Sequence, residues 1–398
     1  MHIALVGPVA TADLLPLLEG DAATLPAGYA GAPMLVTLIT ELLERGHRVT
    51  AITTSDDLPL DWRRPGRAEG ANLAVVYVPM RRRAWRPNGW RAGRIVDLYA
   101  FELRGLRYAI EQTAPDVIHA HWSYEFAWAA VRAGLPHVVT CHDSPLRIAR
   151  ISGSPYRWLK AAMAWHVLKR ARRITTVSPY MLAQVQPLCR VPVSVVPNPV
   201  SIAAPPSQQP RHRRRPRVIM ICNGWMTWKN PEPALRGFAL LANRLPDAEL
   251  VAVGGDFEPG GIAERWWLAQ GLRGRVSFRG PMPHDSVLAL LAECDVLLHS
   301  SLEESFGVVV AEAMAVGLPV VAGADSGAVP WVVGEAGRLV DVRQPEAIAD
   351  ALECLFADPE LAEKCGDLGR KRFLEHFGAP TVAAAYEREY LAALADAA

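Results

Sequence analysis

Two glutamates stand eight positions apart, at Glu304 and Glu312, around the expected start of a helix. Glu304 is expected in the loop ahead of that helix, and Glu312 more than one turn inside it. The pair would bracket the backbone amides of Phe306, Gly307 and Val308, which have no partner within a helix that begins there. Such amides and the positive end of the helix dipole attract phosphate, so this segment predicts a diphosphate site. A carboxylate slightly further along can accept hydrogen bonds from the two hydroxyls of a ribose.

A lysine occupies the loop expected after the first strand of the second half of the chain. Lys229 lies in the segment 223–231, which ends in a proline that begins a predicted helix. A lysine at the carboxyl end of a strand can reach a phosphate as a point charge. Lys229 is therefore a candidate phosphate ligand, and a solvated lysine ahead of a helix is the alternative.

Two strands expected in the first half end in histidines. His121 is followed by Trp122, and His142 is followed by Asp143. Strand ends in a parallel sheet face the ligand, where an imidazole can hydrogen-bond a sugar hydroxyl or support a leaving group. Strand alternation predicts that Trp122 points away from His121. His121, Trp122 and Asp143 are candidate contacts with the acceptor or the sugar, and a structural role for His121 remains open. Adjacency in sequence does not make His142 and Asp143 a catalytic dyad.

The segment 304–322 resembles the donor motif of retaining glycosyltransferases of the GT-B fold, in the large fourth sequence family, and the resemblance extends over nearly the whole chain. It implies that Glu312 holds the ribose, that Glu304 lies near the transferred sugar, and that His142 contacts that sugar. It further implies transfer with retained anomeric configuration. No metal or cofactor is expected, because positive groups and helix amides take the place of a metal at the diphosphate.

Three positions depart from the pattern of this family. Lys229 matches one half of a basic pair, but tryptophans stand where the arginine is expected. The family usually has a pair of glycines in the first half, of which only Gly31 is kept, because Ala30 occupies the other place. Gly31 is a candidate donor contact, and a plain turn at this point is the alternative. Trp331 stands where a glutamate is common. A catalytically weak nucleotide-sugar-binding or scaffold protein therefore remains an alternative, as does a GT-B nucleotide-sugar epimerase.

Short β-rich runs alternate with helical patterns in both halves of the chain, which predicts parallel strands with crossover helices. The expected fold class is α/β, with two Rossmann-like doubly wound domains that face a central cleft. The expected parts are an acceptor domain over 1–200, a linker over 201–217, a nucleotide-sugar domain over 218–377, and a C-terminal helix over 378–398 that packs back on the first domain. Helices are expected near 34–45, 93–112, 231–244, 285–293, 306–316 and 345–356.

The composition favours a packed protein without a global electrostatic field. Hydrophobic residues make up 51% of the 398 residues and charged residues 21%, which excludes a disordered or fibrous chain. The six cysteines are scattered, so neither a zinc knot nor a disulfide framework is expected. The first residues are expected to form a strand rather than a signal peptide, and no apolar run reaches the roughly 18 residues that span a bilayer. A cytoplasmic location is expected.

Two basic runs, Arg81–Arg94 and Arg211–Arg217, are the candidates for partner binding by charge. Trp85 and Trp90 interleave with the first run, so a peripheral contact with anionic lipid at the inner face of the membrane is one interpretation, and a solvated loop is the other. Nucleic acid is not expected, because the net charge is +1 and no binding module accompanies the arginines. The expected partners are a UDP- or GDP-linked sugar donor and a glycan, lipid-linked or small-molecule acceptor.

Overall fold

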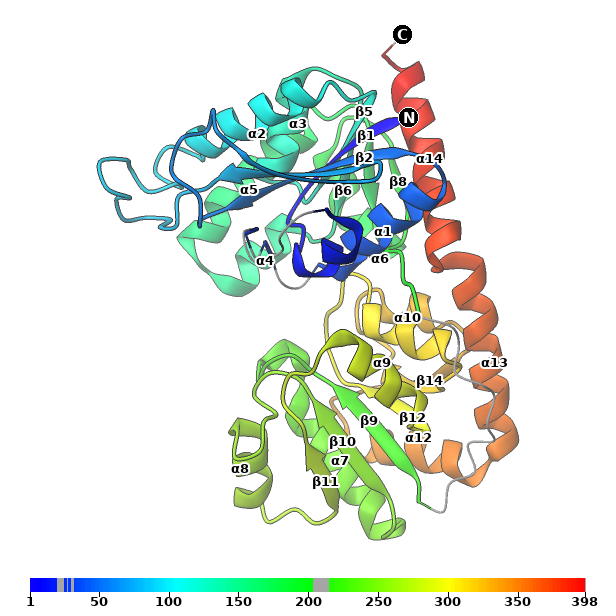
Figure 1. Ribbon diagram of the computed structural model, residues 1–398. Coiled ribbons are helices and arrows are strands. Elements are labelled where there is room, and N and C mark those ends of the chain that lie inside the picture. Colours follow the sequence, from blue (N-terminus) through cyan, green and yellow to red (C-terminus); the bar gives the residue numbers. More distant parts are fainter. Residues whose placement is uncertain (20–24, 27, 30–31, 203–214, 398) are drawn as a thin grey trace. The chain divides into compact units, whose positions relative to one another are not determined.

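The computed structural model describes residues 1–19, 25–26, 28–29, 32–202 and 215–397. The chain forms two compact units (Figure 1): unit 1 comprises Met1–Pro199 and Ala379–Ala398, and unit 2 comprises Val200–Gly378. Gly31, the glycine singled out in the sequence, lies outside the described residues, as does most of the expected linker and of the second basic run.

Unit 1 is built on an eight-stranded sheet with the order β3-β4-β2-β1-β5-β6-β7-β8. All neighbouring strands pair in parallel except β3 and β4, which are antiparallel. Its central strands are buried along their length because helices cover the sheet. The strands are β1 His2–Val6, β2 Arg48–Ser55, β3 Gly66–Gly70, β4 Leu73–Pro79, β5 Val117–His121, β6 His137–Cys141, β7 Ile174–Thr176 and β8 Val193–Val195.

Several helices of unit 1 begin with proline, whose fixed φ suits the first helical turn. The helices are α1 Pro33–Glu44, α2 Ala100–Thr113, α3 Glu125–Ala133, α4 Pro145–Ser152, α5 Pro155–Leu168, α6 Pro179–Val185 and α14 Ala379–Ala395. Short 3-10 helices span Ala12–Leu17 and Gln186–Leu188. The helix expected near 93–112 begins only at Ala100, because Leu98 and Tyr99 have φ values of 51° and 62° and break the helical path.

The helix α14 belongs to unit 1 although the whole of unit 2 precedes it in the sequence. It packs against α1, β5 and β6. Tyr386 and Tyr390 are buried in the hydrophobic core of unit 1, and Tyr390 Oη lies 2.7 Å from His119 Nδ1 on β5. The helix therefore completes the core of unit 1.

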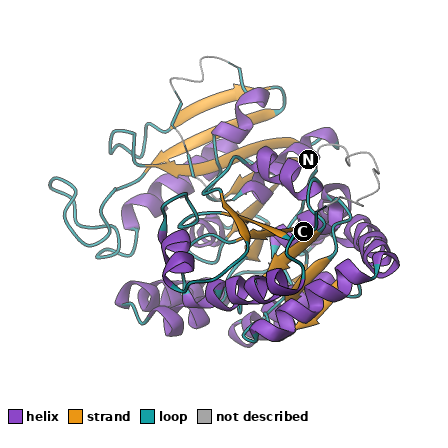
Figure 2. Ribbon diagram, turned by 90° about the horizontal axis from the view of Figure 1, so that it is seen from below, coloured by secondary structure: helices purple, strands orange, loops and turns teal. Residues whose placement is uncertain are grey.

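Unit 2 contains a six-stranded parallel sheet with the order β11-β10-β9-β12-β13-β14. Its strands are β9 Arg217–Ile221, β10 Glu249–Val253, β11 Arg275–Phe278, β12 Val296–His299, β13 Val320–Gly323 and β14 Gly337–Val340. Its helices are α7 Pro231–Arg244, α8 Ile262–Ala269, α9 His284–Ala292, α10 Val308–Ala315, α11 Val329–Val333, α12 Pro345–Ala357 and α13 Pro359–His376, with a 3-10 helix at Thr227–Lys229. Figure 2 shows strands flanked by helices throughout the molecule.

The prediction of an α/β fold with two doubly wound sheets is confirmed. The expected helix near 306–316 is present but begins at Val308, because Gly307 has a φ of 94° and caps it. Within the described ranges, no helix combines the length and the apolar character that crossing a bilayer requires.

Candidate functional site

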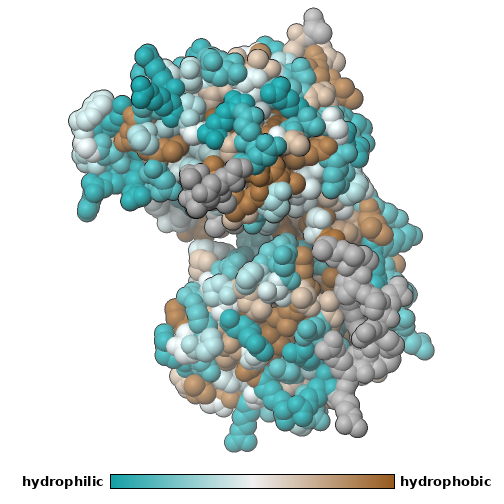
Figure 3. Space-filling view, viewed as in Figure 1, coloured by the Kyte–Doolittle hydropathy of each residue, from teal (hydrophilic) through white to brown (hydrophobic). Residues whose placement is uncertain are grey.

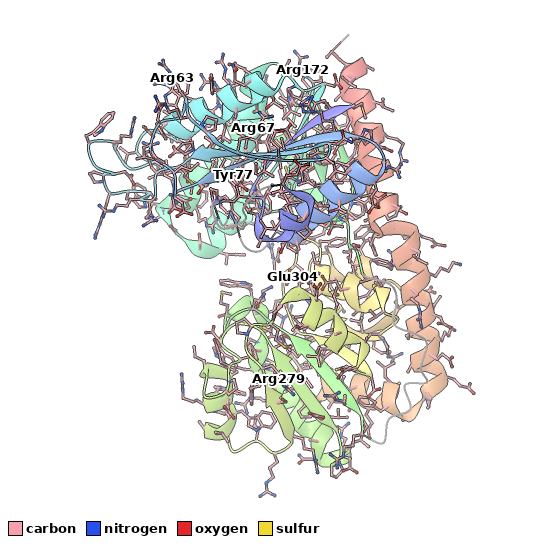
Figure 4. The ribbon with its side chains drawn as sticks, in the orientation of Figure 1. Arg63, Arg67, Tyr77, Arg172, Arg279 and Glu304 are labelled. Atoms are coloured by element: carbon pink, nitrogen blue, oxygen red, sulfur yellow. The ribbon has the colours of Figure 1, made fainter. Side chains whose placement is uncertain are left out.

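The loops that follow β9 and β12 lie against each other in unit 2, because these two strands are neighbours in the sheet. Ser300 Oγ donates to the carbonyl of Lys229 at 2.7 Å, and the amide of Leu302 donates to the carbonyl of Trp228 at 2.8 Å. These bonds bring Lys229 Nζ to 2.6 Å from Glu304 Oε1. Figure 4 shows Glu304 beside α9 and α10. Two predicted site residues, 75 positions apart, thus form one ion pair.

The surroundings of Glu304 keep its carboxylate ionised. Burial alone would raise the pKa of Glu304. This effect is outweighed by the charge of Lys229, by the nearby His299 and by hydrogen bonds from Lys229 and Ser301, so the pKa of Glu304 lies below its usual range. His299 Nε2 lies 3.8 Å from Glu304 Oε1, and burial lowers the pKa of His299. At neutral pH the site therefore presents a carboxylate beside a cation and a neutral imidazole.

A third loop, which follows β13, fixes the backbone around Glu304. The amide of Ala328 donates to the carbonyl of Glu304 at 2.9 Å, and Ser326 Oγ donates to the carbonyl of Ser301 at 2.6 Å. Ser326 is buried, so this support is shielded from solvent. The segment 326–330 stands at a place typical of the resembling family, but the sequence alone assigned it no firm role.

The amino end of α10 offers backbone donors next to this ion pair. Gly307 is its N-cap, and the amides of Phe306, Gly307 and Val308 donate to no acceptor that the described part of the chain supplies. The Phe306 ring is buried and packs edge-on against Phe377 and Trp331, with ring centroids 5.4 and 6.4 Å apart. Trp331, at the position where a glutamate is common, therefore supports the turn that begins α10.

Glu312 is the fifth residue of α10 and is almost completely buried, with its side chain 6% exposed. Its Oε1 lies 2.6 Å from Nε2 of His284, the first residue of α9. Glu312 therefore lies on a buried face of α10 rather than on its exposed surface. His284 was missed by the sequence analysis, because only the packing of α9 on α10 brings it to Glu312.

In unit 1 the ends of β5 and β6 bring two predicted histidines together. His121 Nδ1 lies 2.9 Å from His142 Nε2, and both rings are buried. Strand alternation predicted that Trp122 points away from His121, but the strand does not continue through Trp122. β5 ends at His121, Trp122 has a φ of 62°, and its ring centroid lies 4.4 Å from that of His142. The strand alternation on which the prediction rested stops one residue earlier.

Burial keeps these histidines neutral. It lowers the pKa of His142 to about 4, although Asn198 acts in the opposite direction, and it lowers the pKa of His121 well below the usual value. Burial also lowers the pKa of His119 to about 3. His119 Nδ1 lies 2.7 Å from Tyr390 Oη, and His119 Nε2 lies 2.7 Å from Thr140 Oγ1. At neutral pH the pair therefore offers hydrogen bonds rather than charge.

Asp143 has a different partner from its neighbour in the sequence. Tyr124 Oη donates to Asp143 Oδ1 at 3.0 Å, whereas His142 is bonded to His121. Burial raises the pKa of Asp143 to about 6. Asp143 and His142 thus belong to two separate hydrogen-bonded pairs.

The predicted residues fall into two groups. Unit 2 joins the Lys229–Glu304 ion pair, the amides at the start of α10 and Glu312. Unit 1 joins His121, Trp122 and His142 at the ends of adjacent strands. Among the described residues, no group of three or more histidine, cysteine, aspartate or glutamate side chains is arranged to hold a metal ion.

Two family models match the chain. The model described as glycosyl transferases group 1 matches residues 207–372, and the model described as glycosyltransferase family 4 matches residues 32–204. The D-inositol 3-phosphate glycosyltransferase of Corynebacterium glutamicum is 34% identical over 158 residues, and this match spans 38% of each chain. The MMP alpha-(1->4)-mannosyltransferase of Mycolicibacterium hassiacum is 28% identical over 77% of each chain.

Solved structures share the fold over the full length. Sucrose-phosphate synthase from Thermosynechococcus elongatus has a TM-score of 0.71 at 20% identity and covers 100% of both chains. Anabaena HepE in complex with UDP and glucose has a TM-score of 0.68 at 18% identity, over 98% of this chain and all of that one. With the two family models, these similarities show that the chain belongs to the group 1 glycosyltransferases of the GT-B fold.

Proposed function

We propose that this chain transfers a sugar from a UDP- or GDP-linked donor to a glycan, lipid-linked or small-molecule acceptor, with retained anomeric configuration and without a metal. One observation carries the proposal: between the Lys229–Glu304 ion pair and the buried Glu312, α10 begins with amides for which the described residues provide no acceptor. This arrangement combines donors for a diphosphate with an acceptor for ribose hydroxyls. HepE, which shares the fold, has been solved with UDP-glucose.

In the proposed donor site, the amides of Phe306, Gly307 and Val308 bind the diphosphate, and Lys229 supplies a positive charge. Negative charge grows on the diphosphate as its bond to the sugar breaks, and these groups are preorganised to stabilise it. Glu312 accepts hydrogen bonds from the ribose hydroxyls. His284 now lies 2.6 Å from one of its oxygens, so ribose must share or replace that contact.

Glu304 is proposed to stabilise the positive charge that develops on the sugar. Its pKa is held below the usual range, so it is a carboxylate at neutral pH. An ionised carboxylate suits that electrostatic role better than the donation of a proton. Transfer with Glu304→Ala should therefore fall more than donor affinity does.

In unit 1, His142 is proposed to contact the transferred sugar as a neutral hydrogen-bonding group. His121 holds the other side of the pair, and Trp122 packs on the His142 ring. Contacts of His121, Trp122 and Asp143 with the acceptor or the sugar remain part of the proposal. Gly31 is also proposed as a donor contact, at a position outside the described residues.

The test is a panel of labelled UDP- and GDP-sugars given to the purified chain with and without acceptors. Expected results are transfer to an acceptor, or slow hydrolysis of the donor, and loss of both with Glu304→Ala. The control Glu346→Ala removes an exposed glutamate at the start of α12 and should behave as the unchanged chain.

Two outcomes would overturn the proposal. Saturable donor binding with neither transfer nor hydrolysis would identify a scaffold protein. An epimerised sugar released without acceptor would identify an epimerase.

A further inference from the structure

The loop that joins β4 to α2 carries an unusual set of exposed side chains. We define residues 81–98 as the Arg–Trp loop; in Figure 1 it extends to the left of unit 1. Trp90 is 85% exposed and Trp85 is 51% exposed. Val96 and Leu98 are exposed as well. Two tryptophans and two aliphatic residues exposed within one loop are typical of a surface that binds a partner.

The base of this loop is clamped by a buried arginine. Arg81 is 1% exposed, and its guanidinium donates to both carboxylate oxygens of Glu102, at 3.0 and 2.6 Å. The same guanidinium donates to both oxygens of Asp97 at 2.8 Å and to the carbonyl of Ala92 at 3.0 Å. Arg81 thus connects the outgoing and the returning arm of the loop.

Further contacts fix the outer part of the loop. Asn88 accepts a hydrogen bond from the amide of Arg83 at 2.9 Å and donates to its carbonyl at 3.1 Å. The Arg94 guanidinium donates to carbonyls on the outgoing arm. At Gly93 a Cβ atom would lie 2.4 Å from the carbonyl oxygen of Ala84, so the two arms touch at their backbones. The fold therefore holds the exposed side chains in place.

The loop is also strongly positive. Residues 81–94 contain six arginines and no acidic residue. Arg81 is neutralised by its two carboxylate partners, and Arg82 pairs with Asp56 at 2.9 Å. Arg83 and Arg86 are exposed and form no ion pair with the described residues. Within the loop, Arg86 follows Trp85 in the sequence and Arg91 lies against the Trp90 ring, so both tryptophans have a positive neighbour.

We propose that the Arg–Trp loop docks on an anionic lipid surface. Tryptophan places its ring at the boundary between headgroups and acyl chains, and arginine side chains reach lipid phosphates while their stems stay in the apolar layer. Figure 3 shows pale, teal and brown residues close together on the projecting left part of unit 1.

Lipid fits these observations better than another polyanion does. An acidic protein or an anionic glycan would pair with Arg83 and Arg86. Neither of these partners would account for the exposed apolar side chains of Val96 and Leu98. The Arg91 guanidinium stacks 4.1 Å from the centre of the Trp90 ring, which keeps a charge at the base of the apolar side chain. This pairing suits a surface that is charged outside and apolar beneath. The proposal is independent of the donor site, because it uses none of its residues.

The test is flotation of the full chain with vesicles of neutral phosphatidylcholine or of phosphatidylcholine mixed with anionic phosphatidylglycerol. We expect binding to the anionic vesicles, and its loss at high salt, because salt screens the arginines. Arg83→Gln with Arg86→Gln should weaken binding about fivefold for each arginine. Trp85→Ser with Trp90→Ser should weaken it about tenfold for each tryptophan.

Matched controls distinguish docking by this loop from non-specific adsorption of the protein to vesicles. Trp165→Ser removes a tryptophan that is 52% exposed on α5, and Arg273→Gln with Arg275→Gln removes two exposed arginines of unit 2; both should bind as the unchanged chain does. Thermal unfolding of every variant checks the fold. Equal binding to neutral and anionic vesicles would overturn the proposal, and so would loss of binding in the control variants. Binding to heparin but to no vesicle would assign the loop to an anionic glycan instead.

Discussion

Replacing Glu304 by glutamine should separate nucleotide binding from sugar transfer. Glu304 Oε1 lies 2.6 Å from Lys229 Nζ, so a phosphate that bonds to Lys229 must compete with this carboxylate. Glutamine keeps the shape of the side chain but removes the negative charge. The Glu304→Gln variant should therefore bind a nucleoside diphosphate more tightly while transferring sugar more slowly.

The size of the effect follows from the environment of the pair. A hydrogen bond between charged groups contributes about 1.5–3 kcal/mol, and solvent weakens pairs that it reaches. About a fifth of each side chain is exposed, so the lower limit applies. Release of about 1.5 kcal/mol corresponds to roughly tenfold tighter binding of UDP or GDP. Lys229→Met removes the cation itself and should weaken the same binding by at least about tenfold.

Isothermal titration of UDP and GDP into both variants measures these opposite shifts, with Glu346→Gln as the control. The reasoning fails if Glu304→Gln weakens nucleotide binding as Lys229→Met does. Urea unfolding gives a second readout. Because the pKa of Glu304 is depressed, its contribution to stability is present above the unfolded-state pKa of about 4.3 and is lost as pH falls through the folded-state pKa. Glu304→Gln should remove that part of the pH dependence.

Three other variants test separate parts of the structure. Glu312→Ala should cost about 1–3 kcal/mol of UDP binding but much less of 2′-deoxy-UDP binding, as calorimetry would measure; equal losses would contradict a ribose contact. The pKa of His119 is near 3 and that of His142 near 4, so unfolding takes up protons below pH 6.5, and each should reduce stability by about 2 kcal/mol at pH 5. Urea unfolding of His142→Asn should show a smaller loss between pH 7 and pH 5, and an unchanged loss would argue against a buried neutral ring. Glu102→Leu should destabilise unit 1 by about 3–5 kcal/mol, since it leaves the Arg81 charge buried with one partner fewer; a thermal midpoint within error of the unchanged chain would refute this.

The parts of the site that sequence could predict lie within one strand, loop and helix. The segment that holds Glu304 and Glu312 reads as a loop followed by a helix, and the structure places the first in the loop and the second in α10. Local signals suffice there, because a glycine ahead of an apolar helix marks where the helix begins. Likewise, Pro231 marked the start of α7 at the correct residue.

The parts that sequence could not predict depend on contacts between distant segments or on unusual backbone angles. The ion pair of Lys229 with Glu304 requires β9 and β12 to be neighbours in the sheet. No local sequence pattern predicts the order of strands in a sheet. The contact of His284 with Glu312 requires α9 to pack on α10. The position of Trp122 depends on a φ of 62°, which is uncommon for tryptophan and carries no sequence signal.

The place of α14 in unit 1 has a consequence for biosynthesis. The ribosome makes residues 1–199 first, then the whole of unit 2, and only afterwards the helix that supplies Val382, Tyr386 and Tyr390 to the first core. Until then one flank of β5 and β6 lacks its cover, and His119 lacks the Tyr390 hydroxyl. Until α14 is made, the apolar surface that it covers in unit 1 is exposed, whereas unit 2 already has all of its residues.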